Sequence, residues 1–209
     1  MGKIKNIVLD FGHGGIDKYG NYTTAPAKMH KFSNGDIAYE GELNRQIGGH
    51  VYTCLRSHRE FNVVCTVKED DPRDISLSHR VRVANKFNPS ETLFVSIHCN
   101  ASSGHNASGF ELFTTKGATK SDKFAEKIAD AVEGCYSKRN IRLRYDLSDG
   151  DKDKEADFYV LRKTKCPAVL LECGFFDNTK DFKFLKDPIF QGDLGSMIYT
   201  GILNYNSSL

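Results

Sequence analysis

A chain of 209 residues is long enough to build one sizeable hydrophobic core, since a domain of this size buries roughly 70% of the surface that its unfolded chain exposes. Hydrophobic residues make up 39% of the chain and charged residues 27%, which excludes a disordered or low-complexity protein. The formal net charge of +2 is too small to indicate a nucleic-acid partner.

The apolar segments are all short. The N-terminal run from Ile4 to Leu9 gives way to polar and glycine residues before it reaches signal-peptide length, so we expect the chain to remain in the cytoplasm as synthesised. No stretch approaches the ~18 apolar residues of a membrane span, and we expect no stable membrane insertion. The six cysteines form no CxxC pair, which favours free thiols: Cys54, Cys65, Cys99, Cys135, Cys166 and Cys173.

Short apolar runs predict five strands, over residues 4–9, 61–67, 92–97, 110–113 and 168–171. Helical periodicity predicts helices over residues 40–58, 77–87, 121–136 and 189–203, with Ser121 as a candidate N-cap. Strands that alternate with helices indicate an α/β fold. We therefore expect a single domain with a mostly parallel, twisted sheet that is flanked by helices on both faces.

Three chemically competent side chains come directly after predicted strands. His13, His98 and Glu172 each follow an apolar run, and ligands of α/β sheets bind beyond the carboxyl ends of the strands. Glu40 instead opens the first long helix, after a loop over residues 14–39. We expect these four groups to converge at one edge of the sheet.

A hydrolytic zinc site needs three nitrogen or oxygen ligands, an open position for water and a carboxylate beside that water. His13, Glu40 and His98 could supply the ligands, and Glu172 the carboxylate. Simpler interpretations exist for each residue, because a lone histidine after a glycine is usually a turn residue and a glutamate at a helix start usually complements the helix dipole. Glu172 is more informative, since an ionised group after a buried strand is costly without a partner.

Six segments of the chain, taken together and in order, resemble the zinc N-acetylmuramoyl-L-alanine amidases of the type-3 group. These segments are 9–15 (LDFGHGG), 40–44 (EGELN), 73–85, 96–101 (SIHCNA), 109–112 (GFEL) and 167–178 (PAVLLECGFFDN). The resemblance implies that His13, Glu40 and His98 bind one Zn²⁺ ion and that Glu172 is the catalytic carboxylate.

Glu42 competes with Glu40 for the ligand role. In the family the liganding glutamate stands four residues before the asparagine, so Asn44 favours Glu40. Phe11 stands where the family commonly has proline, and Gly41 where lysine is common. Cys99 and Cys173 are also unusual, but alternation along a strand predicts that they face the core if His98 and Glu172 face the site.

Two irregular segments remain. The loop over residues 14–39 carries Tyr19, Tyr22 and other aromatic residues, and either packs on itself or lines a glycan groove. Residues 138–165 begin with basic residues and continue with acidic ones. Their spacing fails the calcium-loop template, so we expect a solvated charged loop.

The resemblance implies a zinc hydrolase that cleaves the bond between N-acetylmuramic acid and L-alanine in peptidoglycan. Two alternatives stay open: a wall-binding or regulatory module without turnover, and another zinc peptidase or deacetylase that acts on wall fragments. We expect residues 1–209 to form one catalytic amidase domain without a separate wall-binding domain. The expected absence of a signal peptide favours a phage endolysin that a partner holin releases onto the wall of the infected host, whereas oligomeric state is not predicted.

Overall fold

The computed structural model describes residues 3–24 and 28–209, and its elements alternate between strands and helices along the chain. The strands are β1 (Asn6–Phe11), β2 (Met29–Lys31), β3 (Ile37–Tyr39), β4 (Asn62–Cys65), β5 (Thr92–Asn100), β6 (Glu111–Thr114), β7 (Lys154–Glu155) and β8 (Ala168–Phe175). The helices are α1 (Glu40–Ser57), α2 (Leu77–Ala84), the 3-10 helix η2 (Pro89–Glu91), α3 (Lys120–Ser137), α4 (Tyr159–Lys163), α5 (Thr179–Leu185) and α6 (Pro188–Ser207).

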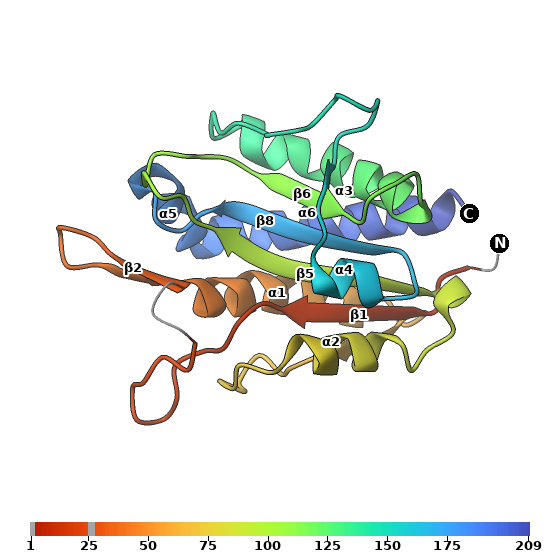
Figure 1. Cartoon of the computed structure of the whole chain (residues 1–209), viewed down its shortest axis with the longest axis horizontal. Coiled ribbons are helices and arrows are strands. Elements are labelled where there is room, and N and C mark those ends of the chain that lie inside the picture. The colour runs from red at the N-terminus through yellow and green to blue at the C-terminus, as the bar shows by residue number, and fades with distance from the viewer. Residues whose placement is uncertain (1–2, 25–27) are drawn as a thin grey trace.

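Six of the strands form one sheet in the order β4-β1-β5-β8-β6-β7. The pairs from β4 to β8 are parallel, and β6 runs antiparallel to β8. Helices α1, α3 and α6 cover one face, whereas α2 and α4 lie on the other (Figure 1). The prediction of a single α/β domain with a mostly parallel sheet and helices on both faces is confirmed.

Strict alternation along the central strands divides the core into two layers. Leu93, Val95 and Ile97 of β5 pack into the larger cluster under α1, α3 and α6, and Cys99 continues that row. Phe94 faces the smaller cluster under α2 and α4, on the same side of β5 as His98. One face of the central strands is therefore apolar throughout, while the other becomes polar towards the carboxyl ends.

Several element boundaries differ from the sequence predictions. Strands β5 and β8 continue past residues 97 and 171, so His98 and Glu172 lie within strands rather than after them. The N-cap of α3 is Thr119 and not Ser121, because Thr119 and Asp122 form a reciprocal capping box. The Ser121 hydroxyl instead accepts a hydrogen bond from the Ala168 amide. The hairpin β2–β3, strand β7 and the short helices α4 and α5 were not predicted.

Among residues 3–24 and 28–209, none of the helices combines the length and apolar composition that a bilayer crossing requires. All six cysteines are unpaired, as the sequence predicts, and Cys99 and Cys173 are buried in the larger core cluster. Burial raises the pKa of both thiols well above the ordinary value. These two side chains therefore contribute to the packing of the hydrophobic core.

A buried ion pair between Asp10 and Arg80 anchors the carboxyl end of β1. Arg80 Nη1 lies 2.8 Å from Asp10 Oδ1, and the side chains are 3% and 0% exposed. Thr66 and Ser96 donate hydroxyl hydrogen bonds to the same carboxylate. Burial opposes ionisation, but Arg80 and these hydrogen bonds outweigh it and hold the pKa of Asp10 below its ordinary value.

We expect Asp10→Asn to lower the free energy of unfolding by about 3–5 kcal/mol at pH 7, because it leaves a buried guanidinium unpaired. A carboxyl group with a lowered folded-state pKa stabilises the fold above its unfolded pKa and loses that effect as the pH falls through the folded value. The difference in the free energy of unfolding between wild type and Asp10→Asn should therefore become smaller only below about pH 4. Urea unfolding of metal-free protein at several pH values measures this.

The matched control is Lys5→Met, which breaks an exposed ion pair with Glu91 and should cost less than ~1 kcal/mol. An Asp10→Asn variant no less stable than this control would contradict the role of the buried pair.

Candidate metal centre

His13 lies in a tight turn that follows β1. Its backbone has a φ of 64°, in the left-handed region that non-glycine residues seldom occupy. Asn44 Nδ2 donates to the Gly12 carbonyl at 3.1 Å, and Arg45 Nη1 donates to the His13 carbonyl at 3.0 Å. Arg80 Nη2 donates to the same carbonyl at 3.4 Å. Three side chains thus hold the strained turn in place.

His98 and Glu172 are neighbours across the two central strands. They are register partners in the parallel pair β5–β8, so their side chains project side by side from the same face. The sheet is irregular immediately beyond them, between His98 and Asn100. This pairing places an imidazole and a carboxylate together at the polar end of the sheet.

Glu40 reaches the two histidines from the first turn of α1. Its side chain is 1% exposed, and its Oε1 atom lies 3.1 Å from His13 Nε2 and 3.1 Å from His98 Nδ1. The second oxygen, Oε2, is shielded from solvent and lies 3.3 Å from Lys28 Nζ. The structure therefore brings together His13, Glu40 and His98, as the sequence predicts, and it places Glu172 beside them.

The carboxyl groups of the site have opposite proton affinities. Burial alone would raise the pKa of Glu40, but hydrogen bonds from His13 and His98 hold it below its ordinary value. Burial and then the charge of Glu40 raise the pKa of Glu172 well above its ordinary value, and Lys28 opposes that shift. Burial lowers the pKa of His98 despite its contact with Glu40. Of the two carboxyl groups, Glu172 therefore binds a proton more strongly than Glu40.

The donor atoms of His13, Glu40 and His98 fit a metal ion. One ligand atom from each lies within 4.8 Å of the others, and no other group of three or more such residues within residues 3–24 and 28–209 does this. Two atoms bound at 2.0–2.1 Å to a tetrahedral ion lie about 3.3 Å apart, close to the 3.1 Å between each imidazole and Glu40. Glu40 Oε2 is shielded from solvent and has Lys28 Nζ at 3.3 Å, so Oε1 is the oxygen that faces both imidazoles.

A pocket of about 220 Å³ opens beside these residues. Its polar lining residues include His13, His98, Glu172 and Lys28. Its apolar and aromatic lining residues come from α2, α4 and the residue before α4: Leu77, Phe158, Tyr159 and Val160. The pocket can therefore hold a ligand that has both a polar reacting group and an apolar or ring-shaped group.

Sequence reasoning missed Lys28 and Glu111. Lys28 of the 14–39 loop lines the pocket, and no motif marks it. Glu111 pairs in register with Glu172 on β6 and contacts Arg144 and Lys154, at 2.8 and 2.6 Å. Its place in the segment 109–112 was the signal that could have drawn attention to it.

Glu42, His105 and the aromatic residues of the 14–39 loop make other contacts. Glu42 Oε1 accepts a hydrogen bond from the Ile16 amide at 2.7 Å and is absent from the metal-ligand group. His105 pairs with Asp177 at 2.8 Å. Within the described part of the 14–39 loop, Tyr22 packs on Tyr39, and Phe32 stacks on Phe182. Residues 25–27 of that loop lie outside the described residues.

Comparison with known proteins agrees with this geometry. The N-acetylmuramoyl-L-alanine amidase family matches residues 7–204. The chain belongs to this family. An uncharacterized cell wall amidase of Bacillus anthracis is 33% identical over 206 residues, which cover 96% of this chain and 35% of that protein. The N-acetylmuramoyl-L-alanine amidase LytC of Bacillus subtilis is 28% identical over 203 residues, which cover 96% of this chain and 35% of that protein. This chain thus spans about a third of the length of these two relatives.

Solved structures of N-acetylmuramoyl-L-alanine amidases have the same fold. The amidase from Clostridium difficile 630 superposes with a TM-score of 0.79 at 28% identity, and the match covers 99% of each chain. The catalytic domain of CwlV from Bacillus (Paenibacillus) polymyxa var. colistinus gives 0.74 at 28% identity, over 97% of this chain and 98% of that one. The likeness therefore includes the whole sheet and its helices.

Two departures from the usual amidase pattern have a structural reason. A Cβ atom on Gly41 would overlap the carbonyl oxygen of Gly14, so the loop after His13 packs directly on the backbone of α1. The ring of Phe11 fills the space above Gly48, where a Cβ atom would overlap it. In this chain, glycines on α1 thus accommodate both the loop after His13 and the ring of Phe11.

We expect Gly12→Ala to weaken metal binding at least tenfold, because the added Cβ atom would overlap the imidazole of His98 and displace it. Calorimetric titration of chelator-treated protein with zinc measures the effect. Gly134→Ala on α3 is the matched control, since a Cβ atom there meets no neighbour within 4 Å. Equal zinc affinity in the two variants would contradict the close packing at His98.

Proposed function

We propose that this chain hydrolyses the amide bond between N-acetylmuramic acid and L-alanine in peptidoglycan, using one zinc ion held by His13, Glu40 and His98. The observation that supports it most directly is the convergence of these three side chains beside Glu172, in a chain that belongs to the amidase family. Two relatives carry the name of this activity, LytC of Bacillus subtilis and CwlM of Bacillus licheniformis.

The donor set supports zinc over harder cations. Two imidazole nitrogens and one carboxylate oxygen are a common ligand set of catalytic zinc, whereas magnesium and calcium prefer oxygen atoms alone. A bound zinc ion would act as a Lewis acid on the amide carbonyl and lower the pKa of a water molecule. Asn44, Arg45 and Arg80 orient His13 through its backbone, and so fix the direction of its imidazole.

Glu172 supplies the proton transfers. Its carboxylate accepts a proton from the attacking water and returns it to the leaving nitrogen of L-alanine. The raised pKa of Glu172 favours uptake of that proton, and the adjacent Lys28 counters the charge of the two glutamates. Phe158 and Tyr159 also line the pocket and offer aromatic faces on which a sugar ring or a peptide methyl group can pack.

The reaction is tested with purified, zinc-loaded protein and isolated peptidoglycan sacculi, and the released products are identified by mass spectrometry. We expect stem peptides with a free L-alanine amine, and we expect their release to stop when a chelator removes the metal. Cleavage at another bond would assign the chain to a different class of wall hydrolase. Binding to sacculi without any released product would support a module that has lost turnover.

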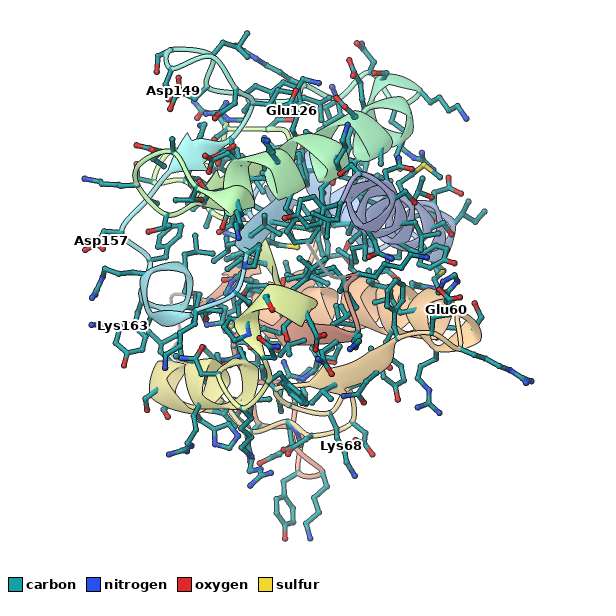
Figure 2. All side chains as sticks on the ribbon, turned by 90° about the vertical axis from the view of Figure 1, so that its right-hand side faces the viewer. Glu60, Lys68, Glu126, Asp149, Asp157 and Lys163 are labelled. Atoms are coloured by element: carbon teal, nitrogen blue, oxygen red, sulfur yellow. The ribbon has the colours of Figure 1, made fainter. Side chains whose placement is uncertain are left out.

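We expect Glu172→Gln to lower kcat by about 10²- to 10⁴-fold while zinc remains bound, because the amide cannot accept the proton. Turnover of the sacculi and metal content by mass spectrometry are measured on the same preparation. Glu60→Gln is the control, since Glu60 is 73% exposed on the molecular surface (Figure 2). Near-normal turnover of the Glu172→Gln variant with intact zinc would remove Glu172 from the mechanism.

The role of a phage lysin that a holin releases stays a prediction.

A further inference from the structure

Asp153 is a buried carboxyl group outside the proposed metal centre and its pocket. It lies in the segment that the sequence predicts to be a solvated charged loop, yet only 2% of its surface is exposed. Its Oδ2 atom accepts a hydrogen bond from the hydroxyl of the fully buried Thr114 at 2.6 Å. Its Oδ1 atom is shielded from solvent and has no donor within residues 3–24 and 28–209. An ionised oxygen in such surroundings is costly.

Asp151 is next to Asp153 in space and also has a carboxylate oxygen without a hydrogen-bond donor. Its Oδ1 atom is also shielded from solvent and lacks a donor in the described parts of the chain. The two carboxyl groups are close enough to share a hydrogen bond, which requires that one of them carries a proton. Burial raises the pKa of Asp153 to about 7. As carboxylates, the two groups need a positive charge between them.

The surrounding side chains supply further negative charge. After burial, the charge of Asp149 acts most strongly on Asp151, and the charge of Asp122 raises the pKa of both Asp151 and Asp153. Lys152, which stands between the two residues in sequence, pairs instead with Asp130 and Glu126 on α3. Figure 2 shows the loop of Asp149 on the same side of the molecule as Glu126. The lysine nearest in sequence thus does not neutralise the pair.

We propose that Asp151 and Asp153 bind a calcium ion between their carboxylates. Both facing donors are oxygen atoms, as hard divalent cations prefer. Asp151 borders an open hollow of about 600 Å³, which is also lined by Thr119, Asp122, Glu126 and Gly150 together with Lys123 and Lys127. Water in this hollow can complete the coordination shell. Calcium accepts six to eight ligands in irregular geometry, whereas magnesium requires a near-ideal octahedron that this short loop does not prearrange.

The ion would connect the acidic part of the 138–165 segment (the acidic loop) to the rest of the domain. Asp153 is already hydrogen-bonded to Thr114 at the end of β6, and Asp122 belongs to the capping box of α3. A cation between Asp151 and Asp153 would therefore join the loop to the β6 strand and to the start of α3. It replaces the shared proton, so the site should strengthen as the pH rises.

The test is calcium titration of zinc-loaded protein at pH 8, followed by calorimetry and by the thermal midpoint Tm. We expect a single saturable site with a Kd on the order of 10⁻⁴ to 10⁻³ M. At 10 mM calcium, Tm should rise by roughly 3 to 10 °C. Zinc is kept saturating so that the histidine centre stays filled, and no activity is measured, so the outcome is independent of the proposed reaction.

Asp153→Asn and Asp151→Asn should each abolish the rise in Tm. Both variants remove a buried charge, so their calcium-free Tm should equal or exceed that of wild type, which separates a lost site from a lost fold. Asp157→Asn is the control, because Asp157 is 67% exposed and pairs with Arg162. It should retain the full shift.

Three results would overturn the proposal. One is the absence of saturable calcium binding by the wild type up to 10 mM. The second is an unchanged calcium shift in both Asp151→Asn and Asp153→Asn. The third is a wild type that gains stability between pH 8 and pH 6 but does not respond to calcium, which would assign the pair to a shared proton.

Discussion

The buried contact between Arg80 and the carboxyl end of β1 is the constraint on which the metal centre depends. Arg80 neutralises Asp10 beneath the sheet edge and also donates to the carbonyls of Phe11 and His13. The backbone of His13 adopts a left-handed conformation that is unfavourable by itself. The turn therefore persists because a buried arginine requires those acceptors, and the position of the first imidazole follows from that requirement.

The rest of the centre is positioned by regular structure, which needs less reinforcement. His98 and Glu172 are adjacent because β5 and β8 are parallel neighbours with fixed register. Glu40 reaches them because α1 begins at that residue, next to the His13 turn. Asn44 and Arg45 of the same helix donate hydrogen bonds to the backbone of that turn. A strained turn, two strands and one helix start thus provide four functional groups at one point.

The sequence predicted most of the sheet and the convergence of His13, Glu40 and His98 beside Glu172, because both depend on local pattern. Apolar runs locate the central strands, and alternation separates His98 from Cys99 and Glu172 from Cys173. It did not predict the contribution of Lys28, since the loop before α1 has no periodicity that could place one lysine beside Glu40. Asp153 was misjudged for a related reason: its burial depends on contact with Thr114, which is 39 residues away in the chain.

Charge links the acidic loop to the catalytic side of the sheet. Lys154 follows Asp153 directly, and its Nζ atom lies 2.6 Å from Glu111, the register partner of Glu172. If the loop moved, Glu111 would lose one of its cations, and an unneutralised Glu111 would raise the pKa of Glu172 further. Arg144 lies 2.8 Å from Glu111 and belongs to the same 138–165 segment, but its backbone amide is hydrogen-bonded to the Phe110 carbonyl next to β6. Because this second cation is held there separately from Lys154, it limits the rise in the pKa of Glu172 that a shift of Lys154 would cause.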